Sequence, residues 1–201
     1  ADFIENTTVQ AGGTVLSNTI LNANVSAEDK VITTGKKGAV IGGYVHGFKG
    51  IEAMTAGSDA EVKTILHSGY EMKSYERLLE IRRRESEIKA KLSELVDNMT
   101  DAMRETRMGS TSLSLAAEIK MAERDRMKDQ YFEELDKISR EREMLEELME
   151  ASQGAYIKVD GTMYRNLVIC INVEQLTLNR NSGYMKYTAD NGVLEGNVII
   201  H

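Results

Sequence analysis

The sequence predicts a mainly β fold with an α-helical insertion: a parallel β-helix, or solenoid, interrupted by a long antiparallel coiled-coil hairpin. Two patterns predict it. Apolar residues recur every five or six positions in the first third of the chain, and an amphipathic helical pattern runs from about 71 to 152 between glycine-punctuated, β-branched segments. We therefore expect β-helix coils over 1–70, the hairpin over 71–152 with its turn near 108–112, and returning strands over 153–201 that complete the β-helix.

Composition limits the function classes. The 201 residues carry a net charge of −7, which argues against a nucleic-acid groove, because such grooves need clustered Lys and Arg. No apolar run approaches the roughly 18 residues of a transmembrane span. The single cysteine, Cys170, excludes an internal disulfide and a multi-cysteine zinc site, so we expect a cytoplasmic protein.

The spacing of the apolar residues predicts the coils. Three steps of five or six positions make one coil of roughly 16 or 17, and glycine and asparagine fall between the apolar positions, where the chain must turn. An antiparallel sandwich is the alternative, but its turns would be more widely spaced than these apolar steps. The positions expected to face inward are Ile4, Val9, Val15, Ile20, Val25, Val31, Val40, Val45 and Ile51.

Asparagines 18, 22 and 24 allow two interpretations. They could stack in ladders, or they could occupy left-handed corners, which asparagine tolerates. We expect corners.

The helical region carries an apolar seam with the alternating spacing of three and four that a coiled coil requires. Glu85 and Arg142 are the charged residues in the two seams, and the register is less regular near the tip, through Leu115, Ile119 and Met121. The region 71–152 contains 21 acidic and 16 basic residues, so the predicted arm is acidic. The seams are Leu78, Ile81, Ile88, Leu92, Leu95, Met99 and Ala102 in the first helix, and Tyr131, Leu135, Ile138, Leu145 and Met149 in the second.

After Gly154 the chain returns to strand patterns. Leu167–Val173 is almost continuously apolar and is predicted to be a buried strand. Tyr184–Thr188 and Val193–Ile200 flank the turn signal Asp190-Asn191-Gly192, which predicts a terminal hairpin or a last coil.

His46 is the first residue to weigh for catalysis. Solenoid acyltransferases use a histidine base on a coil, so an acyl-transfer enzyme, or a carbohydrate or acyl ligand binder, is one alternative. No strict hexapeptide repeat supports the enzyme. We therefore expect His46 to face solvent at a coil corner.

The remaining candidates also favour structural roles. His67 and His201 have no Cys or His nearby in the sequence, and Cys170 lies in the most apolar strand, where its thiol would be buried and inert. The glycines from Gly35 to Gly50 lack a Walker ending and are better explained as corners. Arg82-Arg83-Arg84 has carboxylate neighbours, which predicts a solvated ion-pair surface. We expect no catalytic, cofactor-binding or metal-binding residues.

The order of short motifs around the helical pattern resembles that of the FapA family, flagellar assembly protein A. The matching positions are Lys37-Gly38, Ile41-Gly42-Gly43, Ile51-Glu52-Ala53, Gly57-Ser58, Thr64 and Ser68-Gly69. Two positions depart from the family pattern: Glu61-Val62 stand where Gly-Thr is usual, and Arg165-Asn166 stand where Pro-Gly often lies.

The resemblance implies a right-handed parallel β-helix that leaves for an antiparallel coiled coil and then returns to close its end. It also implies that further coils precede Ala1. The family has no established catalytic residues to transfer to this chain. The family name also implies a link to flagellar or cell-pole assembly. The predicted projecting arm and the lack of a convergent polar constellation lead us to expect a non-enzymatic scaffold, whose arm binds a protein partner or a second copy. A self-polymerising β-helix is a third possibility.

Overall fold

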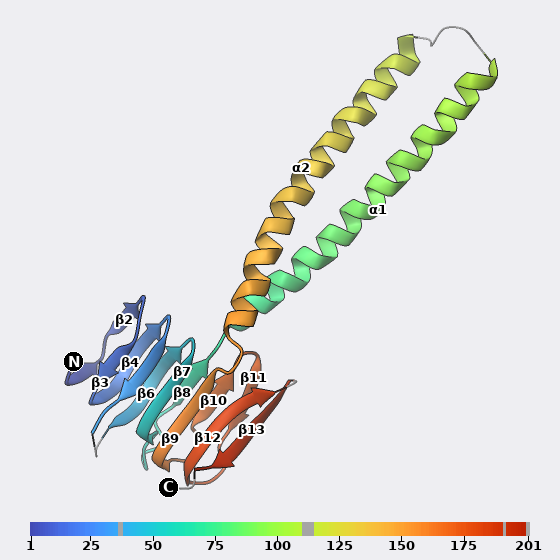
Figure 1. Cartoon of the computed structure of the whole chain (residues 1–201). Coiled ribbons are helices and arrows are strands. Elements are labelled where there is room, and N and C mark those ends of the chain that lie inside the picture. The colour runs from blue at the N-terminus through green and yellow to red at the C-terminus, as the bar shows by residue number, and fades with distance from the viewer. Residues whose placement is uncertain (36–37, 110–114, 191, 200–201) are drawn as a thin grey trace. The chain divides into compact units, whose positions relative to one another are not determined.

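The computed structural model describes residues 1–35, 38–109, 115–190 and 192–199, and it describes side chains outside 97–117. The chain forms two compact units. One consists of Ala1–Tyr75 with Leu148–His201, and the other is Glu76–Glu147. The first unit contains the strands and the second contains most of the two helices (Figure 1).

The first unit is a β solenoid whose parallel strands stack coil on coil (Figure 1). Its strands before the helices are β1 (Phe3–Glu5), β2 (Thr8–Ala11), β3 (Val15–Ser17), β4 (Thr19–Ala27), β5 (Lys30–Thr33), β6 (Ala39–Gly47), β7 (Gly50–Ala56) and β8 (Thr64–Ser68). Those after the helices are β9 (Tyr156–Met163), β10 (Val168–Ile171), β11 (Glu174–Thr177), β12 (Ser182–Asp190) and β13 (Val193–Val198).

The parallel pairs fall on three faces. The first face joins β1, β4, β6, β7 and β9; the second joins β2, β4, β6, β8 and β10; the third joins β3, β5, β7 and β9. Four of these strands turn a corner and contribute to two faces each. Every coil thus passes over the first, second and third face in order, as the sequence predicts for a solenoid.

The inward positions form the core. Each face contributes a column of apolar side chains, one from each coil, and all nine predicted positions belong to these columns. Val9 is half-buried and the other eight are buried. Burial of such columns is the main source of the solenoid's stability, because no coil can bury its apolar side alone. The predicted inward set is therefore confirmed.

The coils differ in length, which the sequence did not show. Val9 pairs with Val25 at the step that the sequence predicts, but Val25 pairs with Val45, which lies further along the chain than a regular coil would place it. The additional residues of that coil lie between the end of β5 at Thr33 and the start of β6 at Ala39. The inward side chains of β4 and β5 still pair with those of β6 and β7 across this longer coil.

The helices leave and rejoin the solenoid at one corner, between the second and third faces. The second face continues from β8 to β10, where Leu66 pairs with Ile169, and the third continues from β7 to β9, where Ile51 pairs with Ile157. The chain between β8 and β9 contains α1 (Met72–Gly109) and α2 (Leu115–Ala151). The hairpin thus replaces a corner, and the inward columns continue on both sides of it, although the pairing of β7 with β9 contains a register shift between Ala53 and Thr55.

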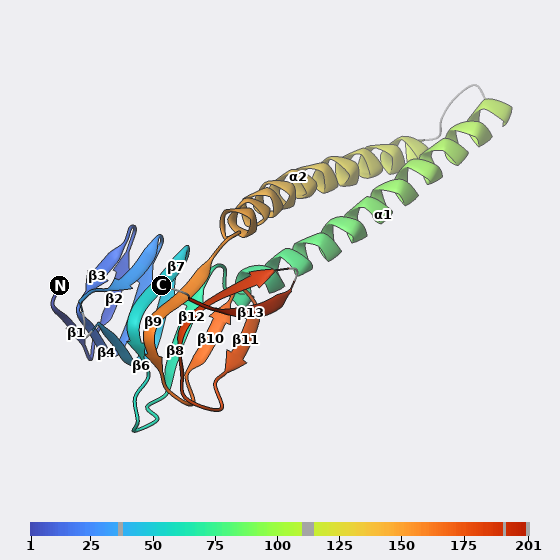
Figure 2. The same cartoon turned by 60° about the horizontal axis from the view of Figure 1, so that its bottom comes forward.

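The far end of the solenoid is closed by antiparallel strands. β11 folds back on β10, β12 pairs with β9, and β12 and β13 form a hairpin (Figure 2). Of the two predicted alternatives, the terminal hairpin is confirmed and the last coil is wrong. Asn191 and Ile200, which belonged to that prediction, lie outside the described residues.

The buried strand predicted at Leu167–Val173 is wrong in extent and in burial. β10 covers only Val168–Ile171, and the chain turns at Asn172, whose φ is 54°. Within β10, Ile169 and Ile171 are buried, whereas Val168 and Cys170 face outward and are half-buried. The apolar run thus combines side chains that point into the core with side chains on a partly covered outer surface, and the strand is not buried on both sides.

The asparagines serve different roles. Asn22 has a φ of 46° and occupies a left-handed corner, as predicted. Asn18 accepts from Thr34 Oγ1 at 2.9 Å and donates to Asp2 Oδ1 at 3.2 Å, so it ties neighbouring coils together. Asn24 lies within β4 and is exposed. The corner interpretation holds for Asn22 alone.

Candidate functional site

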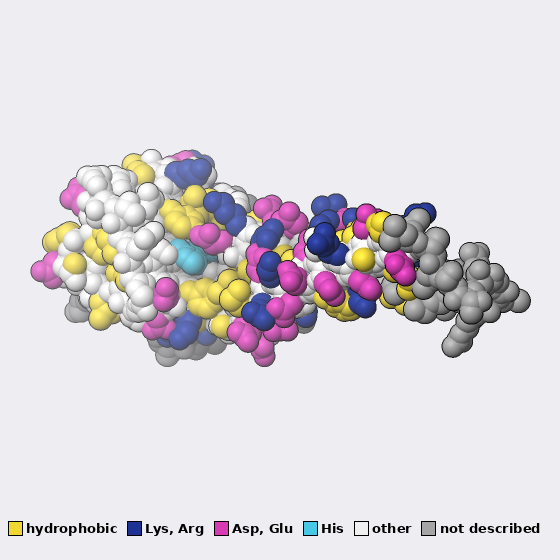
Figure 3. Space-filling model, turned by 90° about the horizontal axis from the view of Figure 1, so that it is seen from above, with side chains coloured by type: hydrophobic (Ala, Val, Ile, Leu, Met, Phe, Trp, Pro, Cys, Tyr) yellow, Lys and Arg dark blue, Asp and Glu magenta, His cyan; other side chains and the backbone are white. Residues whose placement is uncertain are grey.

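A row of polar side chains follows the outer side of the second face, one from each coil. Ser26 pairs with His46, His46 with His67, and His67 with Cys170. Side chains alternate along a strand, and four residues in register therefore share one side of the sheet. In Figure 3 the histidine surface, in cyan, is bordered by hydrophobic side chains.

This row corrects two predictions. His46 is not at a coil corner: it lies within β6, and its side chain is half-buried. His67, predicted to have no Cys or His near it, is buried between His46 and Cys170. The two imidazole rings lie 5.0 Å apart between centroids.

Both histidines make the same pair of hydrogen bonds. The Nε2 atom of His46 donates to the carbonyl oxygen of Gly69 at 2.8 Å, and that of His67 donates to the carbonyl oxygen of Asn172 at 3.0 Å. A carbonyl can only accept, so Nε2 carries the proton in each ring. In the neutral form Nδ1 is then an acceptor, and it faces Ser26 Oγ at 3.3 Å in His46 and Tyr44 Oη at 2.7 Å in His67.

The site therefore contains two hydroxyl–imidazole–carbonyl relays in successive coils. The first resembles the arrangement that activates a serine nucleophile, in which a histidine accepts the hydroxyl proton and a third group orients the ring. The second repeats this arrangement with a tyrosine. A repeated arrangement whose carbonyl always belongs to the following coil is best explained as a connection between coils.

Burial sets the protonation behaviour of the site. It lowers the pKa of His67, with the neighbouring His46 adding to the effect, so His67 is neutral at pH 7. Burial also raises the pKa of Tyr44 well above its ordinary value and raises the pKa of the Cys170 thiol. The predicted inert thiol agrees with this direction, although Cys170 is half-buried and not fully enclosed. Among the described residues, no group of three or more His, Cys, Asp or Glu could hold a metal ion.

The carbonyl that His46 binds belongs to Gly69, where the chain leaves for α1, and the carbonyl that His67 binds belongs to Asn172, which follows β10 in the next coil. Gly69 has a φ of 85°, and a Cβ atom there would lie 2.0 Å from Asn172 Oδ1. The same Asn172 oxygen accepts from the backbone N–H of Tyr70 at 3.2 Å. We call Gly69–Glu71 the exit segment. Glycine is required at its first position both by conformation and by space.

The glycines predicted to form corners do so. Gly42 and Gly43 have φ values of 74° and 84°, and they lie where β6 passes from the first face to the second. No helix begins nearby, because the chain continues as β6 and β7. The phosphate-cradle alternative for this run therefore has no helix N-terminus to support it.

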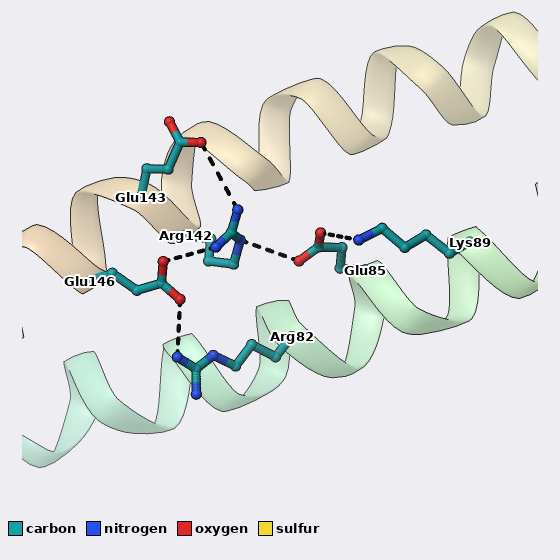
Figure 4. A network of polar contacts seen from close by, with 6 residues as sticks. All are labelled: Arg82, Glu85, Lys89, Arg142, Glu143 and Glu146. Atoms are coloured by element: carbon teal, nitrogen blue, oxygen red, sulfur yellow. Dashed lines mark hydrogen bonds and ion pairs between the residues drawn. The ribbon is translucent and has the colours of Figure 1, made fainter.

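The charged seam residues of the helical unit pair with each other. Arg142 Nε lies 3.3 Å from Glu85 Oε2, and both side chains are largely covered, with 28% and 14% of their surface exposed. Lys89 also contacts Glu85, and Glu146 joins Arg142 to Arg82 (Figure 4). Both charged residues of the predicted seams were recognised from the sequence, but their pairing in one interhelical network was not.

The apolar seam is present where side chains are described. Leu78, Ile81, Ile88 and Leu92 of α1 are buried, Leu95 is half-buried, and Met99 and Ala102 lie among residues whose side chains are not described. All five predicted seam residues of α2 are half-buried. Of the predicted turn, Met108 and Gly109 still belong to α1, and 110–112 lie outside the described residues.

The arginine triplet forms an ion-pair surface, as predicted. Arg83 contacts Glu87 at 3.4 Å on its own helix, whereas Arg82 reaches Glu146 at 3.0 Å and Arg84 reaches Glu134 at 2.8 Å on the other helix. Positive and negative side chains are mixed along the described helices in Figure 3. The triplet therefore does not form a free cationic patch.

The two departures from the family pattern contact each other. Glu61 and Asn166 both have positive φ, 53° and 66°, so each keeps the left-handed backbone that glycine would supply. The Glu61 carboxylate accepts hydrogen bonds from the Arg165 guanidinium and from Asn166 Nδ2, the latter at 2.6 Å. The unusual residues thus compensate for one another across neighbouring coils.

Neither α1 nor α2 contains, in its described residues, an apolar stretch of the length that a membrane crossing needs. No curated protein and no solved structure matches the chain significantly. The family described as the Flagellar Assembly Protein A beta solenoid domain matches residues 1–194. That match covers almost the whole chain and agrees with the solenoid fold. This chain belongs to the FapA β-solenoid domain family.

Proposed function

We propose that this chain is a non-enzymatic scaffold whose helical hairpin binds a protein, either a different partner or a second copy, during flagellar or cell-pole assembly. The observation that carries the proposal is the in-register insertion. Ile157 continues the column of Ile51 after the whole hairpin, so the hairpin adds nothing to the solenoid's continuity. Binding residues commonly lie on elements that a rigid fold holds in place but does not need for its hydrophobic core.

The hairpin itself is proposed to be an antiparallel coiled coil. Supporting this, the contacts between helices run in opposite sequence directions: Arg77 contacts Glu141 at 2.7 Å, whereas Arg84, further along α1, contacts Glu134 at 2.8 Å. The seam residues are among the most covered side chains of both helices. A coiled coil holds a long surface in one conformation and so lowers the entropy cost of binding a partner.

The helical unit exposes large apolar side chains outside the seam. Scattered exposed residues are normal in soluble proteins, but the two most exposed of these, Phe132 at 55% and Met144 at 62%, are of types that interfaces favour. Aromatic side chains and methionine are enriched in protein interfaces. The exposed set over described side chains is Leu79, Val96, Ile119, Met127, Phe132 and Met144.

Deletion of the hairpin tests the proposal. Replacement of Lys73–Gln153 by a short glycine linker should leave the solenoid folded, as judged by its β circular-dichroism signal, and should abolish partner capture in a pull-down from the source cells. Undiminished capture by the deletion variant would show that the hairpin does not bind the partner.

A matched pair of substitutions locates the surface. Phe132→Asp with Met144→Asp should weaken capture, whereas Phe3→Asp, which changes a side chain of the solenoid that is 72% exposed, should not. If the partner is a second copy, sedimentation equilibrium of the purified chain will show concentration-dependent dimers that the helix variant loses. Equal effects of both variants would contradict a helix-specific surface.

A β-helix enzyme or ligand binder is the second candidate, and the contact between Ser26 Oγ and His46 Nδ1 is the observation that favours it. Its experiment is His46→Gln, because glutamine can make both hydrogen bonds but cannot act as a base at neutral pH. An activity or ligand affinity that survives this change does not depend on His46. Loss of activity with the fold intact would instead support the enzyme.

End-to-end polymerisation is the third candidate. Among the described residues, β1, β2 and β3 each pair with a single strand, and an unpaired strand edge can accept a further strand. Sedimentation velocity tests this candidate: polymerisation predicts species that grow with concentration, and a single species at every concentration would reject it.

A further inference from the structure

Tyr44 has one hydroxyl proton and two acceptors. Its Oη atom lies 2.7 Å from Nδ1 of His67 and 3.2 Å from Oε1 of Glu71. A phenol can donate only one hydrogen bond. At any moment, therefore, Tyr44 donates its hydrogen bond either to the histidine of β8 or to the carboxylate of the exit segment.

The protonation state of His67 decides between them. In the neutral ring Nε2 donates to Asn172, so Nδ1 is a bare acceptor and takes the Tyr44 proton over the shorter distance. In the protonated ring both nitrogens are donors, and Nδ1–H must point at the Tyr44 oxygen. The Tyr44 proton is then free for Glu71, and the three groups form a continuous chain from cation to carboxylate.

We propose that Tyr44 is a pH-dependent switch, which releases the Glu71 carboxylate when His67 is neutral and binds it when His67 takes up a proton. No backbone movement is required, since only the hydroxyl of Tyr44 rotates. This inference is independent of the proposed function, because every group in it belongs to the solenoid unit.

The surroundings of His67 oppose its protonation, because burial and the neighbouring His46 lower its pKa. His46 lies against it, with ring centroids 5.0 Å apart, so two positive charges in the pair would repel each other. Asn172 contributes a carbonyl oxygen and no charge. The titratable groups from the elements packed around the site are Tyr44 and His46 of β6, Tyr70 and Glu71 of the exit segment, Cys170 of β10 and Glu174 of β11.

The switch acts at the start of α1. The backbone carbonyl of Glu71 accepts from the N–H groups of Ser74 at 3.0 Å and Tyr75 at 3.4 Å, so Glu71 is the N-cap residue of the helix. A carboxylate fixed beside the first turn is favourable for the helix dipole. Proton uptake by His67 should therefore make the first turn of α1 more ordered.

The experiment is a double-variant cycle read at the imidazole nitrogens of His67 by NMR titration. Glu71→Gln should lower the pKa of His67 in the otherwise native chain, because the chain of hydrogen bonds then ends on a neutral group. In a Tyr44→Phe background, most of that lowering should disappear. An equal shift in both backgrounds, or no shift in the native background, would overturn the proposal.

A measurement on the unaltered chain covers the case in which Tyr44→Phe does not fold. The carboxyl carbon resonance of Glu71 should show a step at the pH at which His67 titrates, and amide exchange of Ser74 and Tyr75, corrected for its intrinsic pH dependence, should slow over the same range. The absence of both changes rejects the switch. His67→Gln, which cannot titrate, should abolish both changes and serves as the control.

Discussion

Removing the charge pair from the helical seam tests how the hairpin is held together. The perturbation is Glu85→Met and Arg142→Met, singly and together. At 3.3 Å the pair has a Coulomb attraction of about 5 kcal/mol at an effective dielectric of about 20, but the cost of desolvating both charges opposes most of it.

The second partners of each charge reduce the effect of a single substitution. Without Arg142, Glu85 still contacts Lys89 at 2.6 Å, and without Glu85, Arg142 still contacts Glu146 at 2.8 Å. Breaking a fully buried pair costs about 3 to 5 kcal/mol. Because neither charge here is left alone or fully buried, we expect each single variant to lose about 1 to 2 kcal/mol.

The double variant should recover most of that loss, because two methionines extend the apolar seam and no charge is left unpaired. The assay is urea unfolding followed at the helical circular-dichroism band. Arg83→Met with Glu87→Met is the control: Arg83 is 74% exposed, and loss of this pair should cost no more than about 0.5 kcal/mol. If the seam substitutions prove additive, the two charges do not interact and the interhelical network is not what aligns the helices.

Four further predictions concern the solenoid. Ile157→Ala should destabilise it by about 3 kcal/mol in urea unfolding, because this side chain is fully buried. Gly69→Ala should cost about 2 kcal/mol or more, and Asn172→Gly should restore part of it by removing the clashing oxygen. Burial lowers the pKa of His67 in the folded chain below its ordinary 6.5. The free energy of unfolding should therefore be highest above pH 6.5 and should fall as the pH drops towards the pKa of the folded state. His67→Gln should remove this pH dependence of the unfolding free energy over the same range. Glu61→Gly relieves the strain of a positive φ but loses a surface ion pair, so it should change the stability by less than about 0.5 kcal/mol. Glu61→Ala keeps the strained backbone and loses the ion pair, so it should lower the stability by about 1 kcal/mol.

The core could be predicted from the sequence because inward positions repeat. Val9, Val15 and Ile20 show the same short interval that later coils repeat, and burial favours apolar residues at inward positions. The seam of α1 was predictable for the same reason. In both cases a short-range periodicity is imposed by one buried side.

The outer row could not be predicted, because it depends on the length of each coil. The steps from Ser26 to His46 and from His46 to His67 are both longer than the regular apolar pattern indicates. The extra residues sit in corners, where sequence patterns are weak. Two histidines that contact each other across coils are therefore far apart in the sequence. The ion pair between Glu85 and Arg142 could not be predicted either, because it depends on the number of residues between the two helices.

The corner between the second and third faces explains why an insertion of this size is tolerated. At the equivalent corner of earlier coils the chain passes in a few residues, from Ala27 to Lys30 and from Gly47 to Gly50. In the coil that carries the hairpin, the chain leaves through Gly69 and returns through Gly154, both with positive φ. Inward columns on either side are unaffected, because a corner contributes no residue to them. The exit segment Gly69–Glu71 at this corner is also where the first histidine relay ends, at the Gly69 carbonyl, and where Tyr44 of the second relay contacts Glu71.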